Sequence, residues 1–371
     1  MTRPTTRPAP PSHARARARD RRVYLGGHPL LFGLLAATRG RPVRRLGRTL
    51  LVHDAAAYRE ALTRLPLDRT AAGTTGGAAR AALPEGGGVL FDQEGGGHRA
   101  DRRGVADRLG ATGVSRLRAV WEPLLVRGVA PLSRGGEVDL VELARELAGS
   151  VVCALLGSGA DPGTVARAAA DAAAASVRSH LPGPRRPGAR AAAARSAVRL
   201  QELLGRSDDA LAVMVAVAAV NTSVAALPRA VAWCADAGLW DQAADPELLP
   251  RLADELLRVT AASPVLPRVA AAAGSVGGCP VRGGDRLVLV ARHAAEAHGR
   301  DPDGRDPAGA GVAHLVFGAG PHVCPGARLA RVQLADVLAA LAPHRPVVAR
   351  ARVDRRAALP GWRSLTVRAG S

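Results

Sequence analysis

Apolar residues recur at the three-to-four-residue spacing of amphipathic helices along most of the chain. Helices are predicted around residues 98–130, 138–156 and 162–180, and also over 55–62, 249–261 and 326–342. The segment 208–237 is apolar on nearly every side, which is typical of a central buried helix. Pro228 should kink or split that helix.

Strand-like patterns are short and lie at the edges of this helical chain. Residues 42–53 predict a β-hairpin with Gly47-Arg48 as its two-residue turn. Asp54 is a candidate N-cap for the helix that follows. Residues 71–97 are rich in Gly and Ala without periodicity, so we expect a loop near a site or a plain connection. A second loop is expected at residues 181–188.

The pattern favours one α-rich domain behind a short tail. Residues 1–22 contain almost no large apolar side chains, which predicts a disordered basic tail. Residues 23–371 show no internal repeat and no domain linker, so we expect a single domain there. A chain of 371 residues with 47% hydrophobic residues is long enough to bury a large core.

The charge balance is strongly basic, with 51 basic residues against 32 acidic ones and a formal net charge of +19. Every basic residue is Arg. Such a charge attracts acidic partners and nucleic acid without specificity, or is a solvated surface. No nucleic-acid recognition motif is present and aromatic residues make up only 2% of the chain, so specific nucleic-acid binding is not expected.

Cysteine usage and hydropathy both point to the cytoplasm. The four cysteines are far apart and form no CxxC pair, which fits a reducing compartment better than a disulfide framework. No stretch is expected to reach the roughly 20 apolar residues that span a bilayer. The apolar run 29–37 after Arg19–Arg22 imitates a signal peptide but is short and follows a break at Gly26-Gly27.

The most informative segment runs from Phe317 to Arg331 and is centred on Cys324. Its glycines permit close backbone approach and positive φ, as a loop against a flat ligand needs. Cys324 lies just before a predicted helix, whose N-terminal dipole stabilises an anionic sulfur. Such a thiolate can serve as a soft axial ligand to haem iron. The alternative is a small buried cysteine in a glycine-rich turn.

This segment resembles the cysteine-ligand loop of the cytochrome P450 superfamily, since it matches F-G-x-G-x-H-x-C-x-G and C-x-G-x-x-L-A-R at every fixed position. The resemblance implies a mainly α fold with small β-sheets, a triangular helical prism with haem b between a central helix and the cysteine-loop helix. It implies Cys324 as the iron ligand. The loop residues implied to bind the cofactor are Phe317, Gly318, Gly320, His322 and Gly326.

Other stretches agree in the expected order, so the resemblance covers roughly residues 23–371. Glu255 and Arg258 match the family's E-x-x-R, a buried ion pair on one helical face. Arg268 resembles the strand arginine that meets a haem propionate. His98 and Arg102 match the H-x-x-x-R of soluble bacterial members and, one helical turn apart, can both face the propionates.

The family's central oxygen-side motif is altered in this chain. Ala219, Asn221 and Thr222 stand where the family usually has glycine, an acid and threonine, and the resemblance implies that they are catalytic. Neutral Asn221 cannot cycle a proton, so proton delivery would depend on Thr222, water or the substrate. The third member of the usual Glu–Arg–Arg cluster is either Arg305 or absent.

The resemblance implies a haem-thiolate monooxygenase or oxidase that uses O2 on a small organic substrate in secondary-metabolite biosynthesis. Hydroxylation, oxidative coupling and cyclisation all stay open. Electrons would come from a ferredoxin and a ferredoxin reductase, because no flavin or iron–sulfur motif is present. Arg328 and Arg331 are candidates for docking an acidic ferredoxin, or simply solvated side chains. The alternative function is a catalytically inactive binding or recruitment module with the same fold.

Overall fold

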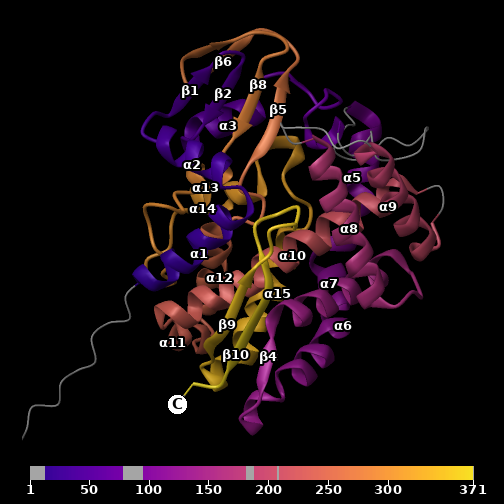
Figure 1. Ribbon diagram of the computed structural model, residues 1–371, viewed down its shortest axis with the longest axis vertical. Coiled ribbons are helices and arrows are strands. Elements are labelled where there is room, and N and C mark those ends of the chain that lie inside the picture. Colours follow the sequence, from indigo (N-terminus) through magenta and orange to yellow (C-terminus); the bar gives the residue numbers. More distant parts are fainter. Residues whose placement is uncertain (1–12, 78–94, 181–187, 207–208, 371) are drawn as a thin grey trace, which may run out of the picture.

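The computed structural model describes residues 13–77, 95–180, 188–206 and 209–370, and Figure 1 shows their arrangement. The helices in the first half are α1 (His13–Gly27), α2 (Pro29–Thr38), α3 (Ala55–Thr63), α5 (Gly95–Leu109), α6 (Ala111–Val129), α7 (Leu140–Leu156), α8 (Pro162–His180) and α9 (Ala189–Leu204). Those in the second half are α10 (Ala210–Ala237), α11 (Trp240–Ala244), α12 (Leu249–Thr260), α13 (Ala291–Ala294), α14 (Ala310–Ala313) and α15 (Ala327–Leu341).

The long apolar segment in the middle of the chain forms the central helix α10. Asp209 caps it by accepting a hydrogen bond from the Ala212 backbone N–H, and the helix continues through Pro228 without a break. By length and composition α10 is apolar enough to cross a membrane, contrary to the expectation that no stretch is. Half of that apolar window is buried, and α10 packs against α7, α8 and α12, so its apolar surface serves the protein core.

Three small sheets complete the fold. The largest has the strand order β1-β2-β8-β5-β3, the second β4-β10-β9 and the third β6-β7. Their strands are β1 (Val43–Leu46), β2 (Thr49–Val52), β3 (Leu67–Asp68), β4 (Glu137–Asp139), β5 (Leu266–Ala270), β6 (Gly274–Val276), β7 (Cys279–Val281), β8 (Arg286–Leu289), β9 (Val347–Val353) and β10 (Trp362–Arg368).

The predicted hairpin and helix cap are confirmed. Strands β1 and β2 pair antiparallel, with Val43 opposite Val52, around a turn in which Gly47 has φ +57°. The Asp54 side chain accepts hydrogen bonds from the backbone N–H groups of Ala56 and Ala57 in the first turn of α3, at 2.8 and 3.0 Å. The predicted helix over 98–130 is instead two helices, because Gly110 has extended backbone (φ −69°, ψ −175°) between α5 and α6.

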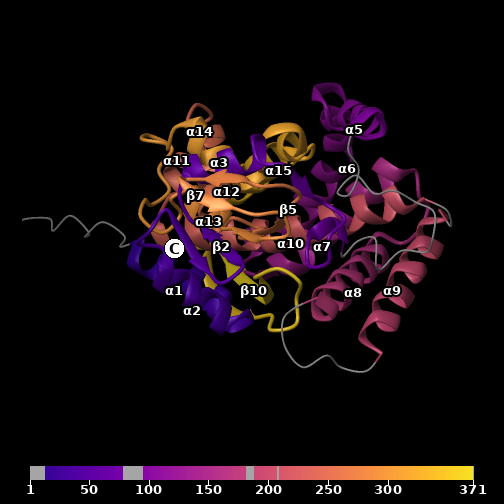
Figure 2. The same cartoon turned by 90° about the horizontal axis from the view of Figure 1, so that it is seen from above.

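The core lies mainly where α6, α7, α10, α12 and α15 meet, and fully buried side chains such as Trp121, Leu147 and Leu252 belong to it. A second core fills the space between the five-stranded sheet and α3. Figure 2 shows α8 and α9 on one side of α10 and α1 and α2 on the other. The helical layer therefore surrounds α10, while the larger sheet stands at one end of the molecule (Figure 1).

The predicted disordered tail is wrong for residues 13–22, which belong to helix α1; residues 1–12 lie outside the described part of the chain. Asp20 is buried and accepts hydrogen bonds from Arg229 Nε (2.9 Å), Arg229 Nη2 (2.6 Å) and Arg292 Nη1 (2.9 Å). The Tyr24 hydroxyl donates to the Thr260 carbonyl oxygen at 2.6 Å. Buried charges need such pairing, and here it anchors α1 to α10 and α13.

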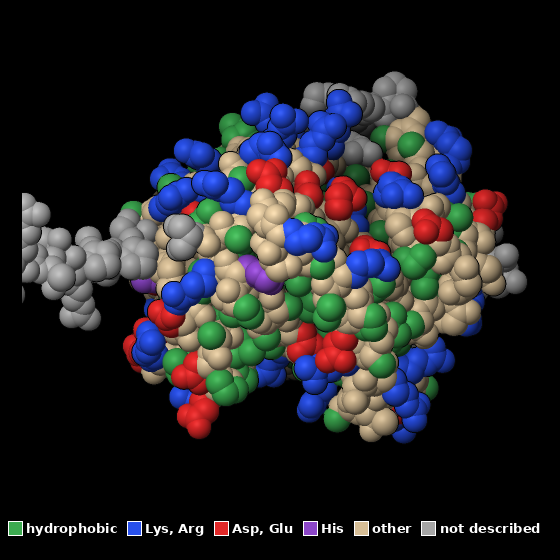
Figure 3. Space-filling view, turned by 90° about the horizontal axis from the view of Figure 1, so that it is seen from below, with side chains coloured by type: hydrophobic (Ala, Val, Ile, Leu, Met, Phe, Trp, Pro, Cys, Tyr) green, Lys and Arg blue, Asp and Glu red, His purple; other side chains and the backbone are tan. Residues whose placement is uncertain are grey.

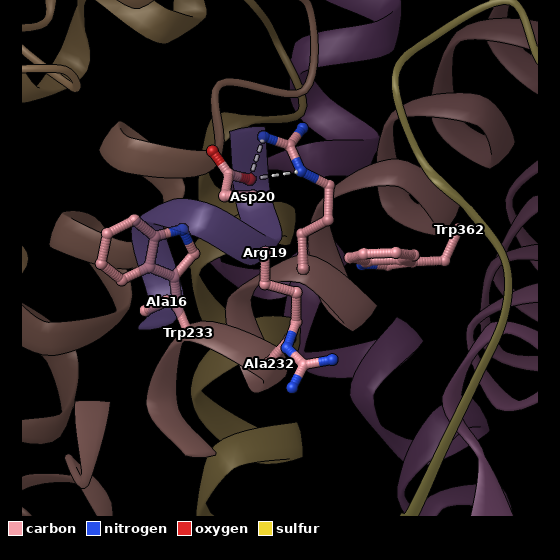
Figure 4. Close-up of a pocket in the computed structure, with 7 residues that line it drawn as sticks. Ala16, Arg19, Asp20, Ala232, Trp233 and Trp362 are labelled. Atoms are coloured by element: carbon pink, nitrogen blue, oxygen red, sulfur yellow. Dashed lines mark hydrogen bonds and ion pairs between the residues drawn. The ribbon is translucent and has the colours of Figure 1, made fainter. Parts of the chain in front are cut away.

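The surroundings of Asp20 are drawn in Figure 4, where α1 faces the indole rings of Trp233 and Trp362. The Arg19 side chain reaches Asp236 of α10, with Nε 2.5 Å from a carboxylate oxygen. Arg15, Arg17 and Arg19 of this segment are therefore paired with acidic residues far away in sequence.

Candidate functional site

The loop before α15, residues 317–326, is closed by a hydrogen bond within its own backbone. The Cys324 backbone N–H donates to the Phe317 carbonyl oxygen at 2.8 Å, which closes the loop. Gly318 (φ +83°) and Gly320 (φ +71°) have the left-handed backbone that favours glycine. A Cβ on Gly320 would also lie 3.2 Å from the Leu62 carbonyl oxygen. The positive φ predicted for these two glycines is present, while their contact with a cofactor stays a prediction.

Cys324 is an exposed residue at the end of this loop, directly before α15, whose N-cap is Gly326. Desolvation by the surrounding protein atoms nevertheless raises the pKa of its thiol, and this outweighs a hydrogen bond from the Gly326 backbone and the charge of Arg102, which lower the pKa. Groups that stabilise an anionic sulfur are thus present beside Cys324, and desolvation opposes them. A bound metal ion deprotonates a coordinating thiol outright.

Arg102 connects α5 to the cysteine loop. Its Nη2 donates to the Val323 carbonyl oxygen at 2.7 Å, one residue before Cys324. His98 lies one turn earlier in α5, but its side chain is outside the described residues. His322 lies in a short 3₁₀ helix of the loop (Gly320–His322) and is partly buried. The structure thus brings Arg102 and His322 to the loop that carries Cys324.

Arg268 in β5 is a cation with an unmet hydrogen-bonding requirement. Its Nη1 donates to the Pro267 carbonyl oxygen at 2.8 Å, but its buried Nε has no partner among the described residues. Burial, and then the charge of Arg69, lower the Arg268 pKa to about 10. A buried guanidinium in this state needs an anion to satisfy it. It therefore fits the haem propionate that the sequence resemblance implies.

Tyr58 of α3 is a neighbour of Arg268 that the sequence did not single out. It is fully buried, and its hydroxyl likewise has no hydrogen-bond partner among the described residues. Burial raises the pKa of this hydroxyl, while the charge of Arg268 lowers it. Only the contact across the fold reveals Tyr58, because a lone tyrosine in an amphipathic helix carries no signal of its own.

Glu255 and Arg258 form the predicted buried ion pair, and both side chains are 0% exposed. Arg258 Nε and Nη2 donate to the two carboxylate oxygens at 2.9 and 2.6 Å. Arg258 also binds the carbonyl oxygens of Ala295 and Arg300, and Glu255 accepts from the Ala308 backbone N–H at 3.0 Å. The pair, which lies on α12, therefore holds residues 295–308 against this helix, and this segment leads into the cysteine loop.

Arg305 is not part of this cluster. Its side chain is exposed, and its backbone N–H binds Asp303 at 2.9 Å. Within the described part of the chain, the Ala308 backbone N–H is Glu255's only other hydrogen-bond partner. A backbone N–H therefore binds the Glu255 carboxylate, where Arg305 was a candidate for a second arginine partner.

On α10, Asn221 is engaged in holding helices together. Its Nδ2 donates to the Val217 carbonyl oxygen of the same helix at 2.8 Å and to the Ala169 carbonyl oxygen of α8 at 3.2 Å. Thr222 donates from Oγ1 to the Ala218 carbonyl oxygen at 2.8 Å. Ala219 packs against the core between α8 and α10. A catalytic role for these three residues stays a prediction.

The two arginines considered for partner docking differ in the structure. Arg331 is paired with Asp254 of α12 through two hydrogen bonds, at 2.5 and 2.7 Å, so it is engaged within the protein. Arg328 is exposed on the first turn of α15. Of these two arginines, only Arg328 has an exposed guanidinium without an ion-pair partner among the described residues, as docking of an acidic partner would require.

The described residues contain no group of three or more His, Cys, Asp or Glu that could hold a metal ion. The sequence resemblance implies a single protein ligand, Cys324, to the iron of haem. Cys324, Arg102 and Arg268 are of the types that such a group needs: one soft axial ligand and cations for its carboxylates.

No protein-family model matches the chain. In sequence it is 37% identical over 106 residues to the 20-oxo-5-O-mycaminosyltylactone 23-monooxygenase of Streptomyces fradiae. That match covers 28% of this chain and 25% of the relative, so the chain spans about a quarter of the length of that protein.

The structural similarity extends over nearly the whole chain. A mutant of P450 EryK in complex with erythromycin B superimposes with a TM-score of 0.72 and 22% identity, covering 92% of this chain and 97% of that one. The mycinamicin VIII C21 methyl hydroxylase of Micromonospora griseorubida, bound to mycinamicin VIII, gives a TM-score of 0.67 and 22% identity, covering 90% and 95%. The chain therefore has the cytochrome P450 fold.

Proposed function

We propose that this protein binds haem b through the sulfur of Cys324 and acts as a monooxygenase or oxidase on a small organic substrate. Two observations together carry the proposal. Cys324 is exposed in a loop turned by glycines, and Arg268 has a buried Nε without a hydrogen-bond partner among the described residues. A bound group that offers both a soft metal and a carboxylate would use both features.

Different residues of the chain would bind the iron and the propionates of the cofactor. Cys324 would ligate the iron, while Arg102, Arg268, His322 and His98 would donate hydrogen bonds to the propionates. Arg102 would exchange its present acceptor, the Val323 carbonyl oxygen, for a charged one. A thiolate-ligated haem, when bound, supplies dioxygen activation that depends on electron density from the sulfur. The Glu255–Arg258 pair keeps the loop in position without touching the cofactor.

The proton-handling residue on α10 would be Thr222. Its hydroxyl donates to its own helix and keeps acceptor capacity for a water or a substrate hydroxyl. Asn221 cannot carry a proton, and its amide is already used to join α10 to α8. Protons would therefore reach the site through Thr222 and ordered water or a polar group of the substrate, with Ala219 shaping the wall beside them.

The relatives suggest the class of substrate. They are a monooxygenase named for a tylactone derivative and proteins solved with erythromycin B and mycinamicin VIII. We therefore propose a role in natural-product biosynthesis, by hydroxylation or by oxidative coupling or cyclisation. Electrons would come from a ferredoxin and its reductase, and exposed Arg328 next to the cysteine loop is a suitable contact for an acidic partner. We expect this chemistry to take place in the cytoplasm.

The proposal is tested by the absorption spectrum of the purified protein after reduction with dithionite and exposure to carbon monoxide. We expect the strongly red-shifted Soret band of a thiolate-ligated haem, and we expect Cys324→Ala to lose it. Cys279→Ala is the matched control, because Cys279 is a partly exposed cysteine outside the site and should keep the band. A protein that takes up no haem on reconstitution would instead be the inactive binding module.

A further inference from the structure

Helix α2 has an apolar face that the described part of the chain leaves exposed. Its inner side is held by Leu35, which is buried against Leu51 of β2 and Val290. On its outer side Leu30 is 88% exposed and Leu34, one turn later, is 44% exposed. The helix contains no charged residue at all, so it is apolar toward the solvent as well as toward the core.

Cations flank this helix at both ends without any acidic residue among them. The 33 residues between Asp20 and Asp54 contain seven arginines and no Asp or Glu. Arg45 and Arg48 pair with Asp285. The other five are Arg21 and Arg22 before α2 and Arg39, Arg41 and Arg44 after it, and none forms an ion pair within the part of the chain that the structure describes.

We call Leu30, Leu34 and these five arginines the α2 face. Its charge pattern differs from that of the surface in Figure 3, where arginines and acidic side chains are mixed. In Figures 1 and 2, α1 and α2 lie at the periphery of the molecule, so the α2 face is free to meet a large flat partner.

We propose that the α2 face docks this protein on an anionic lipid bilayer. An exposed aliphatic helix with cations around it lies in the plane of a membrane interface, where its apolar side enters the acyl boundary and the cations meet lipid headgroups. With ten residues α2 is too short to span the bilayer, so it would rest in the interface. The exposed residues are aliphatic or small and offer no side-chain hydrogen bonds, which suits acyl chains better than a folded protein partner.

The proposal does not depend on the haem site, and a membrane assay can test it without any activity. The full protein is sedimented with vesicles of phosphatidylcholine containing about 30% phosphatidylglycerol and with vesicles of phosphatidylcholine alone. We expect binding to the anionic vesicles only, weakening as salt is raised, because salt screens the headgroup charge.

Two variants separate the apolar from the charged contribution. Leu30→Ser with Leu34→Ser should weaken vesicle binding about tenfold or more, because the inserted apolar surface is lost. Arg39→Gln with Arg41→Gln and Arg44→Gln should weaken it about a hundredfold, at about fivefold for each cation near the anionic surface. Circular dichroism of both variants would establish that they fold.

Matched controls change the same chemistry elsewhere on the surface. Val126→Ser with Val347→Ser removes two exposed apolar side chains, which are 68% and 39% exposed in this structure. Arg116→Gln with Arg199→Gln and Arg251→Gln removes three exposed charges. Both controls should bind vesicles within about twofold of the parent protein, since neither alters the α2 face. Equal losses in the control and α2 variants would overturn the proposal in favour of unspecific attraction. It would also be overturned if no vesicle binding occurred, or if the α2 variants lost binding only to an acidic ferredoxin.

Discussion

Replacing Asp20 by Asn should strongly destabilise the folded protein. Asp20 is 3% exposed and accepts three hydrogen bonds, two from Arg229 and one from Arg292. Asn keeps the shape and one acceptor oxygen but removes the negative charge, so two guanidinium groups lose their counterion. Removal of one partner from a buried ion pair costs about 3–5 kcal/mol of unfolding free energy.

Urea unfolding followed by far-ultraviolet circular dichroism measures this cost directly. With a denaturant slope of about 3 kcal/mol/M, the unfolding midpoint of Asp20→Asn should fall by roughly 1 to 1.7 M. Asp301→Asn is the control, because the pair between Asp301 and Arg17 is more exposed and should contribute less than about 1 kcal/mol. A midpoint that falls by less than about 0.3 M in Asp20→Asn would refute the reasoning that α1 is anchored by buried charge.

Three further changes test other contacts. Glu255→Gln should lower the unfolding free energy by about 3–5 kcal/mol in the same urea assay, since Arg258 is fully buried, and a change below about 1 kcal/mol would contradict this. Arg268→Met should weaken haem binding by about tenfold or more in a spectroscopic titration, while leaving urea stability without haem unchanged or higher, because it removes a buried cation whose Nε is unsatisfied. The pKa of His293 is lowered to about 3 by burial and by its neighbours His53, His298, Arg292 and Arg39. Since its folded pKa lies below its unfolded value of about 6.5, His293 contributes stability that is present above that value and is lost as pH falls toward 3, by about 3 kcal/mol between pH 8 and pH 4. His293→Asn should flatten this loss in urea midpoints measured across that range.

The sequence predicted those features whose determinants are local. Asp54 caps the next helix, Gly47 allows a tight hairpin turn, and Gly318 and Gly320 adopt the backbone that only glycine adopts freely. The E-x-x-R pair could be predicted as well, because residues three apart on a helix share one face. In each case the partners lie within a few residues of one another.

Features that depend on distant partners could not be predicted in the same way. Residues 13–22 have the composition of a solvated tail, and only the acids at positions 236 and 301 and the buried Arg229 explain their order. The sequence drew attention to Asn221 because an amide cannot transfer a proton as an acid can. Its hydrogen bond to α8 could not be predicted, because the acceptor is a carbonyl group 52 residues away. Arg268 was predicted from the resemblance, but the unmet donor that makes it suitable for an anion is a property of the folded packing.

The anchoring of α1 has a consequence for the order in which the nascent protein folds. Asp20 bonds to residues 209 and 272 positions later in the chain. A ribosome adds about 5–20 residues per second, so Asp20 is synthesised roughly 14 to 54 s before Arg292. Until then the Asp20 carboxylate lacks this partner, so the complete set of contacts that anchors α1 forms only after α13 has been synthesised.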